Sequence, residues 1–115
     1  MKALQTLAGL PGVRVAVLAG ADGLALEYAG EEVHEAEQYA AELAGISRAL
    51  VRSASAVNGG RLLRYGFATE NLEVLAVQLE DRILAVAVRR GSDTRALQIE
   101  LARLAVQLMQ PQTRA

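Results

Sequence analysis

The stretch VRVAVLAGADGLALEY, residues 13–28, decides the fold of this 115-residue chain. Residues 13–19 are rich in valine and almost continuously apolar, which is typical of a strand buried on both faces. Gly20-Ala21-Asp22-Gly23 then provides glycines for positive φ and an aspartate for a local side-chain bond, as a tight reversal requires. Apolar and polar residues alternate over 24–28 and predict a second strand. The stretch is therefore interpreted as a β-hairpin, and a phosphate cradle is disfavoured because no helix follows the glycines.

Three other segments have the periodicity of amphipathic helices. Their predicted ranges are 1–10, 31–58 and 93–110. Pro11-Gly12, Asn58-Gly59-Gly60 and Pro111 provide the stop signals. The apolar stripe of the long helix consists of Ala36, Tyr39, Leu43, Ile46, Leu50, Ala54 and Val57, and that of the last helix of Leu97, Leu101, Leu104 and Leu108.

Three strand-like runs lie between these two helices, at residues 61–68, 72–79 and 82–89. Their short connections predict an antiparallel meander. The second and third runs are apolar at both parities, so both faces of the sheet must be covered. The predicted fold class is α+β, a five-stranded antiparallel sheet between helices in the order α-β-β-α-β-β-β-α. We expect one domain over residues 1–115, because no linker or repeat interrupts the pattern.

Composition and charge exclude several function classes. With 12 basic and 13 acidic residues, the net charge is −1, which argues against a nucleic-acid binder. The absence of cysteine excludes disulfides, thiol nucleophiles and cysteine metal sites. No apolar run approaches the ~20 residues of a membrane span, and the N-terminus lacks a signal-peptide pattern. We therefore expect a cytoplasmic protein without membrane insertion.

No combination of residues supports catalysis. Lys2 is the only lysine, so the chain has no GxxxxGK[ST] loop and is not itself a P-loop GTPase. His34 is the only histidine and is expected to be exposed, without a zinc site or a nearby serine nucleophile. Four carboxylates near the start of the long helix fit a solvated terminus favoured by the helix dipole: Glu31, Glu32, Glu35 and Glu37. The sequence predicts no enzyme, no metal and no cofactor.

The long helix carries small residues on the side away from its stripe. Ala41, Gly45, Ala49 and Ser53 recur every fourth residue, with Gln38 and Ala56 extending the face. Such a row lets another helix approach closely, and a mid-helix glycine costs about 1 kcal/mol relative to alanine unless packing requires it. The alternative is chance, since the chain holds 22 alanines.

Charges on the same helix favour a self-complementary contact. Glu35 and Glu42 lie in its first half, and Arg48 and Arg52 in its second half. Two copies packed antiparallel would bring opposite charges together, as a two-fold interface requires. We therefore predict a dimer through this helix. The strand at 61–68 is expected at a sheet edge, where Arg61 and Arg64 either prevent aggregation or flank a pairing with the same strand of a second copy.

The whole pattern resembles the roadblock / dynein light-chain domain family. Residues 13–18 followed by 21–26 resemble its first hairpin, and residues 37–43 the start of its long helix. Residues 72–77 and 82–86 resemble its central strands, and residues 95–104 its last helix. The resemblance covers nearly the full chain through hydrophobic patterns and one Asp-Gly turn.

The resemblance implies a non-catalytic dimer, formed with itself or with a second roadblock-like chain, that regulates or tethers a Ras-like small GTPase. Bacterial members of the MglB type activate a GTPase that sets cell polarity, through a platform of paired long helices. We assign the dimer interface to Gln38, Ala41, Glu42, Gly45, Ala49, Arg52, Leu62 and Arg64. The residues assigned to partner binding are Gln38, Glu42, Arg48 and Arg52.

A small-ligand sensor of the PAS or profilin-like kind, or a structural adaptor unrelated to GTPases, is the alternative interpretation. A sensor requires a cavity with converging polar groups. The predicted core consists of alanine, leucine and valine, so it offers no such cluster.

Overall fold

The structure, a computed structural model, describes residues 2–30 and 33–109. Its elements are helices α1 (Lys2–Ala8), α2 (Val33–Ala56) and α3 (Arg95–Met109) and strands β1 (Val13–Gly20), β2 (Ala25–Gly30), β3 (Arg64–Ala68), β4 (Leu72–Gln78) and β5 (Arg82–Arg89). The predicted α+β class and the order α-β-β-α-β-β-β-α are confirmed. The predictions made for Met1, Glu31, Glu32, Gln110 and Pro111 lie outside the described residues.

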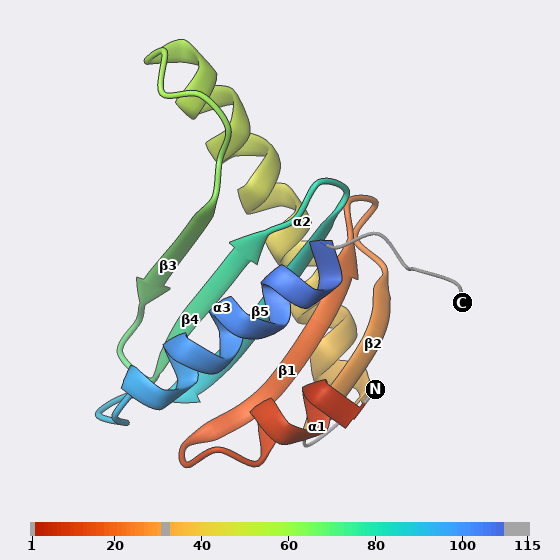
Figure 1. The fold of residues 1–115 in the computed structure, drawn as a ribbon, viewed down its shortest axis with the longest axis vertical. Helices are drawn as coiled ribbons and strands as arrows, with labels where there is room; N and C mark the ends of the chain where they lie inside the picture. Colours follow the sequence, from red (N-terminus) through yellow and green to blue (C-terminus); the bar gives the residue numbers. More distant parts are fainter. Residues whose placement is uncertain (1, 31–32, 110–115) are drawn as a thin grey trace.

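The strands form one antiparallel sheet in the order β2-β1-β5-β4-β3 (Figure 1). The first and last strands of the chain, β1 and β5, are neighbours at its centre, where Leu18 pairs with Leu84. Both are buried on both faces over most of their length, which explains their continuous apolar sequences. β3 is an edge strand, as predicted, and β2 is the opposite edge.

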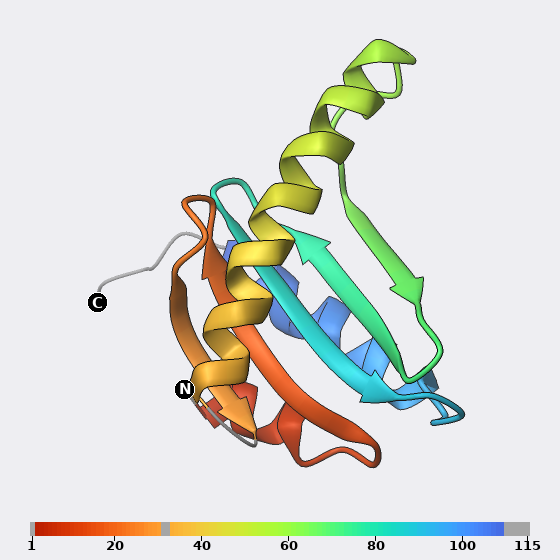
Figure 2. The same cartoon turned by 180° about the vertical axis from the view of Figure 1, so that it is seen from behind.

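Helices cover both faces of the sheet (Figures 1 and 2). α1 and α3 pack on one face, and their buried leucines contact the alternate side chains Ala16, Leu18, Leu84 and Val86. α2 packs on the other face, where Ala36, Ala40, Leu43 and Ala44 meet Val15, Val17, Ile83 and Ala85. Each central strand thus contributes to two separate cores.

The long helix α2 extends beyond the sheet that it covers. Its first half lies over β1 and β2, and its second half projects past the ends of the strands (Figure 2). Val51 is 48% exposed, and Val57, which follows the helix, is 75% exposed. The predicted apolar stripe is therefore buried or half-buried through Ala54 but wrong at Val57, because no strand lies beneath that end.

The β1–β2 connection is the tight turn that the sequence predicts. The Gly20 N–H donates to the Leu24 carbonyl at 2.8 Å, and the Leu24 N–H donates to the Asp22 carboxylate at 3.1 Å. Gly23 has φ of 88°, in the left-handed region that glycine tolerates. Because Asp22 itself accepts an N–H of the turn, this loop is a hairpin connection and not a phosphate cradle.

Candidate functional site

The two flanks of α2 lie over different parts of the sheet. On one flank, the hydroxyls of Ser47 and Tyr65 of β3 lie 2.7 Å apart. On the other flank, a Cβ added to Gly23 would lie 3.5 Å from the Cα of Ala41, and Arg48 donates to the Ala21 carbonyl at 3.5 Å. Ser47 therefore lies on the β3 side of the helix, whereas Ala41 and Arg48 lie above the β1–β2 turn.

The row of small residues is largely exposed. Ala41, Ala49 and Ser53 are exposed and Gly45 is half-buried. A Cβ added to Gly45 would meet only the Arg48 guanidinium, at 3.9 Å, among the atoms of the described chain. Intramolecular packing therefore gives no reason for glycine at this position.

The charged residues of α2 divide into two groups. Glu35 does not belong to a solvated helix start as predicted, because it forms an ion pair with Arg14 of β1 at 3.0 Å and is partly buried. Glu42, Arg48 and Arg52 are exposed, and none of them has an ion pair within the residues that the structure describes. His34 is exposed, as predicted. The unpaired charges are thus available to a partner.

The contact between Ser47 and Tyr65 is a polar feature that the sequence analysis missed. Ser47 is only 5% exposed, and the Tyr65 hydroxyl also donates to the Leu43 carbonyl at 3.3 Å. Burial raises the pKa of Tyr65, and the hydrogen bond with Ser47 opposes that rise. The available signal was the position of Ser47 between Leu43 and Leu50, within the apolar side of the helix.

Tyr65→Phe is expected to lower the free energy of unfolding by about 1–3 kcal/mol, because it leaves the buried Ser47 hydroxyl without this partner. Ser47→Ala in the Tyr65→Phe background should then cost little, since both partners are already gone. Urea denaturation of the wild type, the two single variants and the double variant measures the coupling free energy between the two side chains. Tyr28→Phe is the matched control, because Tyr28 lies on the opposite edge strand and is 42% exposed. Equal losses of stability from Tyr65→Phe and Tyr28→Phe would contradict a stabilising contact between Ser47 and Tyr65.

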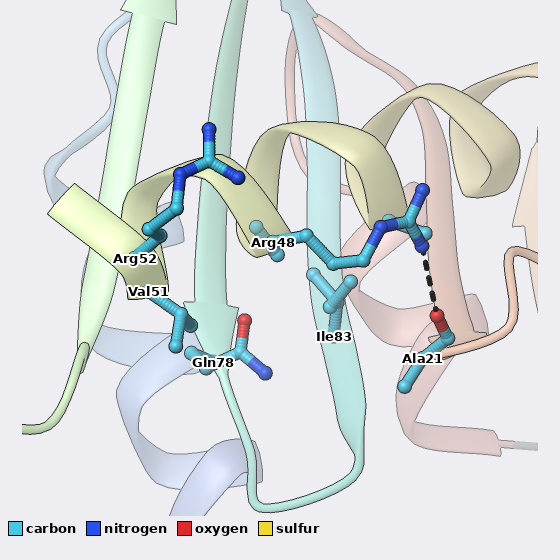
Figure 3. Close-up of a pocket in the computed structure, with 8 residues that line it drawn as sticks. Ala21, Arg48, Val51, Arg52, Gln78 and Ile83 are labelled. Carbon is cyan, nitrogen blue, oxygen red and sulfur yellow. Dashed lines mark hydrogen bonds between the residues drawn. The ribbon is translucent and has the colours of Figure 1, made fainter.

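A groove lies beneath α2 where the helix leaves the sheet (Figure 3). Its volume is about 400 Å³, and it is lined by Ala21, Ala44, Ser47, Arg48, Val51, Arg52, Gln78 and Ile83. Gln78 is held in place because its Nε2 donates to the Leu79 carbonyl at 2.9 Å. Its Oε1 is enclosed and accepts no hydrogen bond within the described chain. The floor of the groove is apolar, with Ala44 and Ile83, and its rim carries the guanidinium groups of Arg48 and Arg52.

Other kinds of site find little support in the structure. Among residues 2–30 and 33–109, no three His, Asp or Glu side chains are grouped so that they could hold a metal ion. Over the same residues, no helix has the length and apolar character needed to span a bilayer.

The sequence matches one known domain family over most of its length. Residues 2–89 match the Roadblock/LC7 domain family. The chain belongs to this family. None of the curated protein sequences compared with this roadblock domain matches it.

Solved structures share the architecture of this roadblock domain. A Roadblock/LC7 domain from Streptomyces avermitilis superposes with a TM-score of 0.85 and 22% identity, over 93% of this chain and 92% of that one. Myxococcus xanthus MglB gives a TM-score of 0.84 and 13% identity, over 94% and 89% of the two chains. An MglB described as having a tetrameric arrangement gives a TM-score of 0.83 and 16% identity, over 94% of this chain and 83% of that one. At these identities the likeness establishes the fold.

The predicted site residues of this roadblock domain are distributed over α2 and the approach to β3. Gln38, Glu42, Ala49 and Arg52 are exposed on α2, Leu62 is half-buried before β3, and Arg64 is exposed on that strand. Ala41 and Arg48 lie apart from β3, above the β1–β2 turn. Gln78 and Ile83 of the groove were not predicted as site residues, because they approach α2 only through the sheet topology.

Proposed function

We propose that this roadblock domain is a non-catalytic, dimeric regulator or adaptor of a Ras-like small GTPase. The observation that carries the proposal is the adjacency of two unpartnered surfaces: the exposed face of α2 and the edge strand β3. A second copy related by a two-fold axis would cover both surfaces at once.

The edge strand supports the dimer half of this proposal. β3 pairs with β4 on one side only, so its other side presents unpaired backbone groups that can extend the sheet. Phe67 pairs with Val74, whose side chain faces the α2 side of the sheet. Phe67 is 40% exposed and Leu63 61%, because α2 lies over β1 and β2 instead (Figure 2). Apolar side chains thus border the edge that a second copy would occupy.

The small-residue row supports pairing of the helices. The interface assigned above, Gln38, Ala41, Glu42, Gly45, Ala49, Arg52, Leu62 and Arg64, combines this row with the approach to β3. Gly45 has no side chain, so a second helix can approach the backbone closely there. The MglB neighbour with a tetrameric arrangement supports the expectation that such domains associate with each other.

The GTPase half of the proposal draws on the MglB neighbours and on the unpaired charges of α2. Gln38, Glu42, Arg48 and Arg52 are the proposed partner-binding residues. Arg48 lies on the flank away from β3, so pairing through β3 would leave it accessible. The charged side chains provide the polar contacts that fix orientation in a regulatory complex.

The proposal is tested by capture and by hydrolysis. The purified chain is first shown to be a dimer by sedimentation velocity, then immobilised and exposed to native lysate with a GTP analogue or with GDP. We expect a Ras-like GTPase, identified by mass spectrometry, to be retained in one nucleotide state only. The recombinant GTPase is then assayed for binding and for hydrolysis with and without this chain. A well-folded dimer that retains no GTPase in either state would contradict the proposal.

Arg48→Glu combined with Arg52→Glu is expected to weaken GTPase binding by about tenfold or more, because two charge-assisted contacts are replaced by repulsion. Ile99→Glu on α3 is the control, since Ile99 is 67% exposed on the other side of the sheet. The measurement is the dissociation constant of the recombinant complex. Equal losses in both variants would remove these arginines from the interface.

A further inference from the structure

The groove beneath α2 has a chemistry that the proposed function does not explain. We propose that it docks an acidic side chain flanked by an apolar one, presented by a short segment of the protein partner. This proposal rests on the proposed function for the identity of the partner, but the chemistry of the groove is independent of that identity.

The rim of the groove carries two positive charges that form no ion pair with any acidic residue in the described part of the chain. Arg48 and Arg52 are one helical turn apart, where like charges repel each other. Arg48 contacts the Ala21 carbonyl at 3.5 Å, a long hydrogen bond, and Arg52 extends into solvent (Figure 3). Guanidinium groups bind carboxylates through short, charge-assisted bonds. A carboxylate seated between the two arginines would replace repulsion with attraction.

The floor of the groove is apolar. Ala44 and Ile83 are almost fully buried, whereas Val51 remains 48% exposed above them. An apolar side chain placed against Val51 would remove this surface from water, which stabilises the complex. The volume of about 400 Å³ is within the range of sites that hold small groups. These features call for an apolar neighbour beside the carboxylate.

The arginines determine the orientation of the occupant. The Gln78 amide nitrogen donates to the Leu79 carbonyl, and its enclosed Oε1 has no surface that an occupant could contact. The acidic group therefore takes the arginine rim, because only the guanidinium groups there offer it charge-assisted bonds. The apolar group takes the side of Val51 and Ile83.

A second copy of this chain is the less suitable occupant. The groove runs beneath α2 from Ser47, which contacts Tyr65 of β3, to Arg48, which contacts Ala21 of the β1–β2 turn. Pairing through β3 would place the second copy beside the Ser47 end. The Arg48 end would then remain open in the dimer, so a different protein is the proposed occupant of that end.

Titration of the ¹⁵N-labelled chain with acetyl-Leu-Asp-Leu-amide tests the chemistry directly. We expect the backbone signals of Ala21, Ser47 and Gln78 to shift in a saturable manner. Acetyl-Leu-Asn-Leu-amide, which lacks the charge, should bind about tenfold more weakly, since hydrogen bonds to charged groups contribute more than neutral ones. Added salt should weaken only the Asp peptide.

Single arginine variants test whether the Asp peptide binds at the rim of the groove. Arg48→Gln and Arg52→Gln should each weaken the Asp peptide several-fold and leave the fold intact, because both side chains are exposed. Arg90→Gln is the control, an exposed arginine that follows β5 at the other end of the sheet. Equal binding of the two peptides, or undiminished binding by the arginine variants, would overturn the proposal.

The role of the groove in the complex is tested separately from the proposed function. If the GTPase binds the wild-type chain and Arg48→Gln/Arg52→Gln weakens both the peptide and the GTPase, the docking assignment is supported. If that variant loses the peptide but keeps full affinity for the GTPase, the groove is not the docking site for this partner. If no GTPase binds at all, the proposed function fails while the peptide titration still reports on the groove.

Discussion

Gly45→Trp is expected to weaken self-association of this chain at least ~30-fold while the protomer stays folded. The indole would stand in the small-residue row, where the second helix is proposed to approach. Overpacking costs about 1–3 kcal/mol per site, and a two-fold interface contains the substitution twice. The protomer tolerates it because a new side chain at this position meets only the flexible Arg48 guanidinium. Sedimentation velocity over a dilution series gives the dissociation constant.

Gly45→Ala provides the matched comparison for this prediction. It should raise the stability of the protomer by roughly 0.5–1 kcal/mol through helix propensity, because the added methyl group meets nothing closer than 3.9 Å. Circular dichroism should show the same helix content in all three chains. A Gly45→Trp chain that dimerises as tightly as the wild type would exclude this row from the interface.

Leu84→Ala is expected to have the largest effect on stability, a loss of about 2–5 kcal/mol. Leu84 is fully buried on the central strand β5, in the core beneath α1 and α3. Because domains of this kind unfold with a total of about 5–15 kcal/mol, the loss is a large fraction of it. Urea denaturation at one fixed protomer concentration measures the change, since any dimerisation contributes to apparent stability.

Leu24→Ala is the control for that measurement. Leu24 is 63% exposed in the β1–β2 connection, so the same chemical change there should alter stability by less than ~0.5 kcal/mol. A difference of less than about 1 kcal/mol between the two variants would mean that burial in this structure does not describe the protein in solution.

The sequence was sufficient for the fold because local and global signals agree. Residues 13–28 contain both the buried strand and its turn, and the edge position of β3 agrees with the expectation for the segment that carries Arg61 and Arg64. The start of the last helix near residue 93 also agrees with the sequence, since α3 begins at Arg95 and the Asp93 carboxylate accepts from the Arg95 N–H at 3.0 Å. Periodicity determines which side of each helix is apolar.

The candidate site was predictable only in part, because side-chain surroundings depend on the relative lengths of elements. Helical periodicity continues to Val57, but the sheet ends earlier and leaves that residue exposed. Arg48 and Arg52 look equivalent in sequence, yet only Arg48 reaches the β1–β2 turn. Glu35 pairs with Arg14 from a strand 21 residues away, which no pattern within the helix can indicate.

The central position of β1 and β5 has a consequence for biosynthesis. β1 leaves the ribosome early, but one of its two hydrogen-bonding neighbours is the last strand of the sheet, ending at Arg89. Because synthesis proceeds at roughly 5–20 residues per second, one edge of β1 in the nascent hairpin stays unpaired for several seconds. Completion of the sheet therefore depends on a contact between distant parts of the chain, which slows folding. Chaperones that bind extended apolar segments would have that interval in which to act.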